Sequence, residues 1–487
     1  MRSLFTLALL GMAISSASAM QDTLDSEVRE LRGKKGKQAK AERNADVEDD
    51  GKVKRKGKKA RGDRKGKFLE FAAEMAKQYA NVDEFDEHMA EFEDRDDAIL
   101  MVNALADAIE ADEAIEEEKQ GRKGKKGKKG KKGKKKLGPL RLRHNWLSDK
   151  TEAEIRELNN LMVPVNRDSI EALIEDSSAS EDKAESEASV AEDASDSEDT
   201  SDEEDTIEGG ARRLNATTIP DLDLSVEGTG ALLGVKDQST CGSCWAFTAT
   251  SVLEGTLRGS GRKPDQKAFS TQQLVDCTHP NNQATSGWPH AGAYGCNGGF
   301  YHIPWFYDMY LGSTLEENYP YENKLNTACN AAGKPKTRNV GGVRVIDNTG
   351  NPNQLINYMR QNQAPIAIAI DSSYVGILQY DGGVIDGRQI GDTVTSISSC
   401  TTQVDHAVTL VGYELTGATK STYLKLGTNQ YGQPIYSSVS YPAGAWKVQN
   451  SWGTAWGNNG FFYIDIQAGA GVCGMNQYPW APVLTPA

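Results

Sequence analysis

The sequence predicts an α+β protein in which helices precede strands, so that its folded part forms two lobes, one mainly helical and one mainly β. A helical pattern of apolar residues extends from residue 68 to about residue 118. A further helix is expected to begin at or just before Cys244, in CWAFTATSVLEGTLRG. The later segments QVDHAVTLVGYE (403–414), WKVQNSWG and GFFYIDI are typical of strands.

The first residues, MRSLFTLALLGMAISSASAM, combine one arginine, an apolar run and small residues ending at Ala19. This is the layout of a secretory signal peptide that is cleaved after Ala19. The apolar run is too short to cross a bilayer, and we expect no membrane span elsewhere in the sequence. The sequence therefore predicts a protein of the secretory pathway, extracellular or in a lysosome or vacuole, that folds where disulfides form.

Two charged runs of opposite sign contribute to the formal net charge of -14. Residues 121–136 are almost entirely lysine and glycine, and residues 175–205 are rich in serine and carboxylates. Neither run has enough apolar residues to offset the entropy of ordering, so we expect both to be disordered. A solvated spacer is the simplest interpretation, and a polyanion-binding or phosphorylated role is the alternative. Nothing nearby resembles a folded nucleic-acid-binding module, so no nucleic-acid partner is expected.

The helical region before residue 120 carries one apolar stripe. Its members recur at steps of three, four and seven residues: Phe85, Met89, Phe92, Ile99, Val102 and Ile109. A packing helix or a coiled coil would show the same stripe. A second helical piece is expected in HNWLSDKTEAEIRELNNLM, with Ser148 or Asp149 as its N-cap. Further on, the dibasic pair Arg212-Arg213 precedes a glycosylation sequon at Asn215.

All seven cysteines lie in the second half of the chain, which places the oxidised domain there. An odd number leaves one thiol unpaired after three bridges. Cys241 and Cys244 form a C-x-x-C pair, which can be a redox couple, half of a zinc site, or two thiols with unrelated functions. The number of cysteines alone does not decide between these three possibilities.

A cysteine acts as a nucleophile only as thiolate, and its ordinary pKa of about 8.5 leaves it mostly protonated. A helix N-terminus and an adjacent imidazolium lower that pKa, to about 3–4 in the best Cys–His sites. Cys244 stands at the expected start of a helix, which provides the first of these two features. The second, a nearby histidine, has to come from elsewhere in the sequence. Among the six histidines, His406 lies in an alternating strand between Asp405 and Ala407. A single histidine in a strand is more often structural, so its context has to decide.

Residues 219–487 resemble a papain-type cysteine protease. Six motifs match in the order of that family: QSTCGSCWAF (238–247), STQQLVDC (270–277), GCNGG (295–299), ENYPYE (317–322), VDHA (404–407) and NSWG (450–453). The resemblance implies the papain-like two-lobe fold, with a helical left lobe, a β-barrel-like right lobe and a cleft between them. It also implies hydrolysis of peptide bonds.

The resemblance assigns a role to each matching position. Cys244 would be the nucleophile, and His406 its ion-pair partner and general acid. Asn450 would orient the imidazole, and Gln238 would donate its amide N–H to the oxyanion hole beside the backbone N–H of Cys244. Trp452 would shield the Asn–His hydrogen bond from water. The implied substrate-binding residues are Trp245, Gly298, Gly299, Phe300, Ala407 and Trp452.

The disulfide pairing is implied in the same way. The family pattern pairs Cys241 with Cys296, Cys277 with Cys329, and Cys400 with Cys473. The unpaired residue is then Cys244, the thiol that the chemistry needs. A redox couple would need both thiols of the C-x-x-C pair, and zinc would need two more ligands nearby. We therefore expect no metal and no cofactor.

The resemblance extends to an inhibitory propeptide of the type found in papain-like zymogens. The spacing of its motif falls on Glu84, His88, Phe92, Arg95, Ile99 and Asn103, of which His88 and Arg95 depart from the family's residue types. The stretch NWLSD (145–149) resembles a later part of that propeptide. In the family, this region passes through the cleft in reverse orientation and blocks it without being cut. The chain's own propeptide would therefore be an intramolecular inhibitor.

The predicted domains are a signal peptide (1–19), a basic low-complexity segment (20–67), a helical propeptide (68–163) interrupted by the run 121–136, an acidic linker (164–213) and a peptidase domain (214–487). We expect a monomeric zymogen of a cysteine endopeptidase that acts on proteins and peptides. Acid should activate it by weakening carboxylate contacts of the prodomain, with processing near residues 212–219. An apolar or aromatic residue is expected at P2 of the substrate.

Two alternatives belong to other classes of protein. The chain could be a catalytically silent binding or matrix protein that works through its charged runs. It could also be an exopeptidase or a peptide ligase on the same scaffold. The insertion THPNNQATSGWPHAGAY precedes GCNGG rather than following it, which favours an endopeptidase. A second insertion, between Gly412 and Trp446, is expected to form a hairpin.

Overall fold

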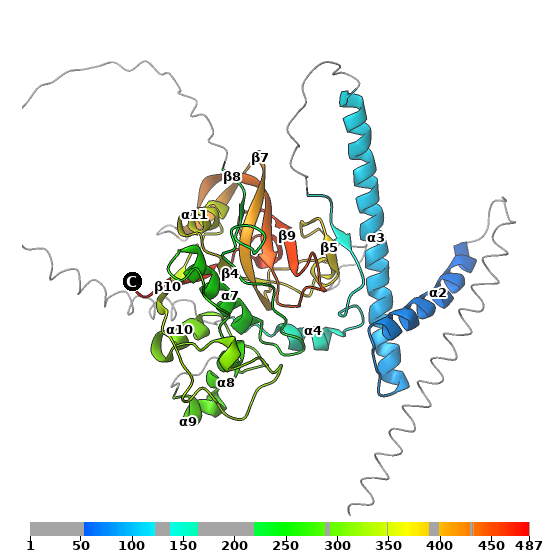
Figure 1. The fold of residues 1–487 in the computed structure, drawn as a ribbon. Helices are drawn as coiled ribbons and strands as arrows, with labels where there is room; N and C mark the ends of the chain where they lie inside the picture. Colours follow the sequence, from blue (N-terminus) through cyan, green and yellow to red (C-terminus); the bar gives the residue numbers. More distant parts are fainter. Residues whose placement is uncertain are drawn as a thin grey trace, which may run out of the picture. The chain divides into compact units, whose positions relative to one another are not determined.

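The computed structural model describes residues 53–121, 137–163, 219–287, 293–347, 349–388, 399–428, 431 and 433–486 (Figure 1). The expected signal peptide, residues 122–136 of the lysine–glycine run, the acidic run, Arg212-Arg213 and Asn215 lie outside these residues. The chain divides into one unit of Met1–Met101 with His144–Glu154, and another of Val102–Arg143 with Ile155–Ala487. Within the described residues, none of the helices has the length and apolar character needed to cross a membrane.

The first unit is built on two helices, as the apolar stripe predicts. Helix α2 spans Val53–Glu74, and α3 begins at Val82 and continues to Gly121. A small aromatic core joins them: Phe68, Leu69, Phe71, Phe85 and Phe92 are all buried. The Phe92 ring also stacks on His144, with ring centroids 4.1 Å apart. The stripe residues Phe85, Met89 and Phe92 therefore lie on the packing face of α3 within this unit.

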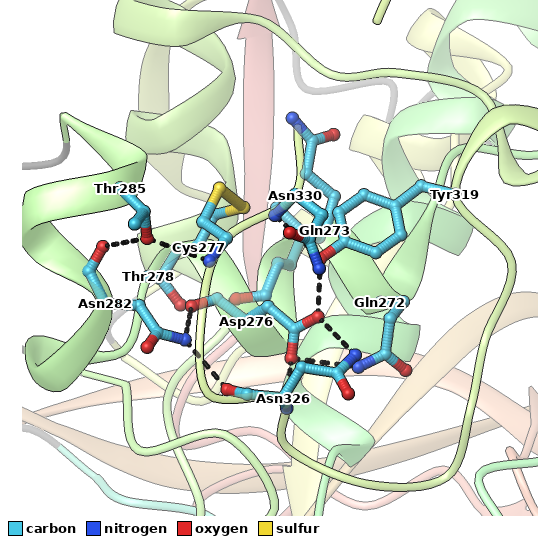
Figure 2. The surroundings of a disulfide bond; sticks show 12 residues. Gln272, Gln273, Asp276, Cys277, Thr278, Asn282, Thr285, Tyr319, Asn326 and Asn330 are labelled. Carbon is cyan, nitrogen blue, oxygen red and sulfur yellow. Dashed lines mark hydrogen bonds between the residues drawn. A yellow bond between two sulfur atoms is a disulfide. The ribbon is translucent and has the colours of Figure 1, made fainter. Parts of the chain in front are cut away.

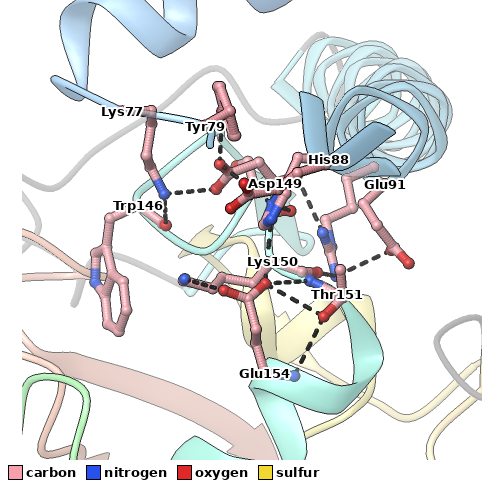
Figure 3. A network of polar contacts seen from close by, with 12 residues as sticks. Lys77, Tyr79, His88, Glu91, Trp146, Asp149, Lys150, Thr151 and Glu154 are labelled. Carbon is pink, nitrogen blue, oxygen red and sulfur yellow. Dashed lines mark hydrogen bonds and ion pairs between the residues drawn. The ribbon is translucent and has the colours of Figure 1, made fainter. Parts of the chain in front are cut away.

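A buried polar network in the first unit includes His88, one of the two departures from the propeptide motif (Figure 3). The Nδ1 atom of His88 lies 2.6 Å from the main-chain oxygen of Asp149. Arg95, which is fully buried, donates to the main-chain oxygen of Ser148 at 3.1 Å and also to that of Lys150. Both unusual side chains therefore bind main-chain carbonyls of the NWLSD stretch or of the residue that follows it.

The Asp149 carboxylate is the other centre of this network. It accepts hydrogen bonds from Lys77 Nζ at 2.6 Å and from the Tyr79 hydroxyl at 2.9 Å. The following helix, α4, spans Glu152–Asn159. Thr151 caps it, because its Oγ1 accepts from the Glu154 N–H while its own N–H donates to Glu154 Oε2, as in a capping box. The expectation of an N-cap at Ser148 or Asp149 was wrong, since Asp149 is engaged by Lys77 and Tyr79.

The second unit holds most of its helices before the sheet, while α11 and α12 lie between strands of the sheet. Its main helix, α7, spans Cys244–Gly259 and begins where the sequence predicts. The shorter helices are α8 (Thr271–Cys277), α9 (Gln283–Ser286), α10 (His302–Leu311), α11 (Pro352–Asn362) and α12 (Val375–Leu378). Every residue of α7 from Cys244 to Leu257 is buried, and the helix packs against strands β7 (His406–Thr428) and β10 (Trp480–Leu484). A helix enclosed in this way holds its first residue in a fixed place.

The sheet of the second unit is mostly antiparallel. Its strands are β3 (Val340–Val345), β4 (Ile366–Ile370), β6 (Val384–Ile385), β7 (His406–Thr428), β8 (Pro434–Gln449), β9 (Phe461–Asp465) and β10 (Trp480–Leu484). Their order is β3-β10-β4-β7-β8-β9-β6, and the short β2 (Leu222–Asp223) adds to β7. Along the described residues this path does not return to its first strand. Helices followed by such a sheet give the α+β architecture that the sequence predicts.

The expected inserted hairpin is formed by the outer halves of β7 and β8. Their pairing continues as far as Thr428 with Pro434. Strand β7 begins at His406, three residues later than the alternating pattern indicates, and β8 ends at Gln449, so that Asn450 follows the strand. Two residues with predicted site roles thus stand at neighbouring strand ends.

A short strand from the predicted propeptide also joins the second unit. Strand β1 (Arg141–Leu142) pairs antiparallel with β5 (Tyr380–Gly382). The Asn103 side chain, from the motif on α3, donates to the Leu142 oxygen at 2.9 Å and accepts from the Leu142 N–H at 3.0 Å. The last residue of the motif therefore holds this strand.

The structure contains the three disulfides that the resemblance implies: Cys241–Cys296, Cys277–Cys329 and Cys400–Cys473. Figure 2 shows the surroundings of the second, where the buried carboxylate of Asp276 accepts from Tyr319 Oη at 2.6 Å and from the Asn326 N–H at 2.8 Å. Cys244 is the free cysteine. Because Cys241 is bridged to Cys296, the C-x-x-C pair consists of two sulfurs with unrelated functions.

Candidate active site

Cys244 is the first residue of α7 and is completely buried. The N-terminus of a helix carries unpaired N–H groups and a partial positive charge, which favour a thiolate. The Cys244 thiol lies within hydrogen-bonding reach of the Ala407 main chain and 3.7 Å from the main-chain oxygen of Asn159. Ala407 follows His406 directly, so the first residue of α7 meets the start of β7.

His406 is oriented by two residues of the NSWG motif. Its Nε2 lies 2.8 Å from Asn450 Oδ1, and its ring stacks on Trp452 with centroids 4.8 Å apart. An amide oxygen can only accept, so Nε2 carries the proton and Nδ1 is the basic nitrogen. Nδ1 is buried and has no hydrogen-bond partner in the described part of the chain. This arrangement leaves one ring nitrogen available for proton transfer.

The Gln238 side chain is also fixed in orientation. Its Oε1 accepts from Ser451 Oγ at 2.6 Å, and its Nε2 donates to the main-chain oxygens of Leu158 at 2.8 Å and Cys241 at 3.1 Å. The Ser451 N–H donates to Asn450 Oδ1 at 2.8 Å. Ser451 therefore links the amide of Gln238 to that of Asn450. No role was predicted for Ser451 from the sequence, although it stands between Asn450 and Trp452 in the NSWG motif.

Residues 155–163, which we call the covering segment, lie over these side chains. Besides the contacts of Leu158 and Asn159, the Leu161 N–H donates to the Asp405 oxygen at 2.9 Å. The Met162 N–H donates to the Gly299 oxygen at 3.0 Å. The covering segment belongs to the predicted propeptide and to the same unit as the residues that it covers.

The predicted substrate-binding residues have different surroundings. Gly299 accepts a main-chain hydrogen bond from the covering segment, and a Cβ on Gly298 would collide with the main-chain oxygen of Asn160. Trp245 and Phe300 are buried in the core, and Gly299 abuts the Trp245 ring. Ala407 is buried beside Cys244, and Trp452 shields His406.

Three consecutive residues near the C-terminus, Asn476, Gln477 and Tyr478, have different surroundings. The Tyr478 ring meets Phe300 edge-on at 5.9 Å. Asn476 instead donates to the main-chain oxygens of Gln467 and Gly469, and Gln477 donates to that of Thr402. Tyr478 is therefore the one of the three that lies beside Phe300.

Burial changes the ionisation of the site. Loss of solvent raises the pKa of the Cys244 thiol to about 12 and lowers the pKa of His406 to about 4. It also raises the pKa of the neighbouring Asp405 to about 7. Burial under the covering segment therefore disfavours both members of the thiolate–imidazolium pair that the sequence predicts for catalysis. Around the described residues, no group of three or more His, Cys, Asp or Glu side chains is arranged to hold a metal ion.

Comparison with known proteins adds independent information. Residues 221–483 match the family described as papain family cysteine protease. Macrodontain-1 of Ananas macrodontes is 31% identical over 260 residues, which cover 52% of this chain and 94% of the relative. The thiol protease SEN102 of Hemerocallis sp. is 32% identical over 278 residues, which cover 56% of this chain but only 62% of the relative.

A solved structure extends the likeness of the fold beyond the peptidase part. The digestive procathepsin L2 proteinase of Tenebrio molitor larval midgut superposes with a TM-score of 0.51, over 86% of this chain and 100% of that chain, at 22% identity. At this identity the match supports the fold alone, and it includes a pro-region. Because the family match covers more than half of the chain and agrees with the order of the six motifs, this protein belongs to the papain family of cysteine proteases.

Proposed function

We propose that this protein is the zymogen of a cysteine endopeptidase of the secretory pathway, held inactive by its own covering segment. The observation that carries the proposal is the arrangement around Cys244. A free thiol at a helix N-terminus adjoins the strand end that bears an oriented histidine, and residues of the same chain lie over both. Its substrates are proteins and peptides, and the enzyme works as a monomer.

The catalytic groups become competent when the covering segment leaves. Water then reaches Cys244 and His406, which removes the burial that disfavours both ions, and the proton passes from the thiol to Nδ1. The thiolate attacks the substrate carbonyl, and an S–C bond forms. Gln238 Nε2, no longer bonded to Leu158, donates to the oxyanion beside the Cys244 N–H.

His406 then gives its proton to the leaving amine, and the C–N bond breaks to leave an acyl-enzyme. Water attacks the acyl carbon while His406 takes its proton, which restores the thiol and releases the acid. Asn450 holds the imidazole in the required tautomer throughout this cycle.

The preference at P2 follows from the neighbours of Leu161. This apolar side chain, from the covering segment, packs in the core cluster that contains Phe300 and Ala407. A substrate side chain that replaces it should also be apolar or aromatic. Cleavage of a peptide library with arginine at P2 in preference to leucine or phenylalanine would contradict this.

The boundaries of the precursor form part of the proposal. A signal peptide of residues 1–19, a propeptide that extends to residue 163, an acidic linker to residue 213 and processing near residues 212–219 fit the zymogen. The three disulfides fit a protein that folds in an oxidising compartment. Mass spectrometry of the activated protein measures the new N-terminus directly.

The decisive experiment compares activated wild type with Cys244→Ala on a long unstructured peptide. The wild type should cleave internal bonds and be labelled once, at Cys244, by an epoxide probe, while the variant should do neither. Ser260→Ala, at the far end of α7, is a matched control that should keep full activity. A Cys244→Ala protein that still cleaves peptides refutes the proposal, and products trimmed only from one end favour an exopeptidase.

A further inference from the structure

Asn159 covers Cys244 with its main chain, but its side chain makes a separate contact that is not needed to cover the active site. Its Nδ2 donates to Ser372 Oγ at 2.6 Å. Ser372 in turn donates to Asp405 Oδ1 twice, from its main-chain N–H and from its hydroxyl, each at 2.8 Å. Asn159 and Ser372 are both completely buried. We call Ser372 and Asp405 together the acceptor site.

The hydrogen-bond directions give this site a defined polarity. A serine hydroxyl has one proton, and here that proton is given to Asp405. The Ser372 oxygen therefore presents only lone pairs to its occupant. The Asn159 Oδ1 atom is buried without a partner in the described part of the chain. The site thus accepts a hydrogen bond from the NH₂ group of the amide and provides no donor for the amide oxygen.

The acceptor site adjoins the reacting atoms on one identifiable side. The main-chain oxygen of Asn159 lies 3.7 Å from Cys244 Sγ, so the side chain that enters the site belongs to a residue at the nucleophile. Asp405 directly precedes His406, and Ile370, two residues before Ser372, pairs with His406 in the sheet. Because His406 protonates the leaving amine, the acceptor site lies on the leaving-group side of the bond that is cut.

We propose that Ser372, with Asp405 behind it, determines specificity for the residue that supplies the leaving amine and favours asparagine, then glutamine, at that position. This proposal rests on the endopeptidase function proposed above. Asn159 occupies the site in the zymogen, and a substrate side chain of the same chemistry takes its place after the covering segment leaves. A carboxylate has no proton to donate to the Ser372 oxygen, and an aliphatic side chain likewise leaves that oxygen without a donor.

The test uses internally quenched peptides that differ only in the residue after the scissile bond: asparagine, aspartate or leucine, which are close in size. Activated wild type should cleave the asparagine peptide with a kcat/KM about 3- to 10-fold above leucine, the range of one neutral hydrogen bond, and also above aspartate. In Ser372→Ala, the ratio of asparagine to leucine should fall to about one. Ser373→Ala is the matched control, since its hydroxyl donates to Asp371 instead and the ratio should persist.

A second measurement avoids altering the enzyme. The peptide IRELNNLMV, residues 155–163, should inhibit activated wild type about 3- to 10-fold better than versions carrying Asn159→Leu or Asn159→Asp. Equal inhibition by all three peptides, equal cleavage of the asparagine and leucine substrates, or a ratio that survives Ser372→Ala each overturns the proposal. If no substrate is cleaved at all by activated wild type, the endopeptidase function itself fails, and this inference fails with it.

Discussion

Both polar atoms of the Gln238 amide, Oε1 and Nε2, are held by hydrogen bonds. Ser451 fixes Oε1, so Nε2 points to a carbonyl of the covering segment, where the oxyanion would form. Changing Gln238 to alanine should lower kcat of the activated enzyme about 10²–10³-fold with little change in KM, because the donor acts on charge that develops in the transition state. Steady-state kinetics after active-site titration measure this.

The control for that measurement is Gln266→Ala. Gln266 is similarly buried, and its amide nitrogen donates to the neighbouring Lys267 oxygen, away from the site. Its kcat should equal that of wild type. A kcat for Gln238→Ala within threefold of wild type would remove Gln238 from the oxyanion hole.

The ionisation of Cys244 should depend on the covering segment. In the zymogen, burial raises the pKa of the thiol to about 12, so the thiolate fraction grows tenfold per pH unit below that value. Alkylation of the zymogen by iodoacetamide should therefore be slow and should rise steadily from pH 6 to pH 9. In the activated enzyme, a Cys–His pair with a thiol pKa of about 3–4 should give a rate that is already flat above pH 5.

Intact-mass spectrometry over a pH series follows this reaction at a single thiol, because the other six cysteines are in disulfides. Cys244→Ala zymogen, which should take up no label, is the control. A zymogen whose alkylation rate reaches a plateau below pH 7 would show that the covered thiol is already ionised.

At the scale of single elements, the network around Asp149 stabilises the helical unit. Its carboxylate is 2% exposed and pairs with Lys77, 18% exposed, at 2.6 Å. Replacement by alanine leaves a largely buried cation without its partner and should destabilise the unit by about 3–5 kcal/mol. Hydrogen exchange of the full-length zymogen should show faster exchange in residues 64–101 and 144–154 of the variant.

Asp112→Ala is the matched control on helix α3, because Asp112 is exposed. Its exchange should match that of wild type. If Asp149→Ala leaves the exchange of this unit unchanged, the network contributes no net stability.

Two elements, β7 and α4, have bounds that differ from those predicted from the sequence pattern. The alternating pattern at 403–414 predicts a strand of ordinary length, but β7 continues to Thr428 because the inserted hairpin extends its pairing with β8. The start of α4 was misplaced because a capping serine or aspartate is indistinguishable from one used in tertiary contacts. Thr151 and Glu154 form the capping box instead.

At the scale of the whole molecule, inhibition depends on how firmly the covering segment is held. Leu161 is 8% exposed within the core cluster. Leu161→Ala should therefore weaken the binding of the covering segment by about 2–5 kcal/mol. The uncleaved zymogen should then show at least about 10-fold higher basal activity than wild type, since 1.4 kcal/mol corresponds to a factor of ten. Initial rates are measured before cleaved product is visible on a gel.

Met162→Ala, at the next position, is the control, because its side chain is 45% exposed. It should leave basal activity near that of wild type. Equal basal activity of Leu161→Ala and wild type would mean that the main-chain contacts of the covering segment alone hold it in place.

Local chemistry was sufficient for much of this protein. The six motifs predicted the family, and the resemblance to that family implied the disulfide pairing that leaves Cys244 free. The helix that begins at Cys244 was predicted from the consecutive residues themselves. The apolar stripe likewise predicted the packing face of α3. Sequence analysis also found the inserted hairpin, from the excess length between two matching segments.

Long-range contacts decided the rest. These contacts join residues up to 213 positions apart in the chain. They are the bond of Ser451 to Gln238, the bonds of His88 and Arg95 to the main chain around Asp149, and the bond of Asn159 to Ser372. The pKa shifts of Cys244 and His406 also depend on the tertiary structure, because desolvation is set by what lies over a side chain and not by its neighbours in sequence. The residues that can react are therefore fixed by sequence, and whether they are ready to react is fixed by burial.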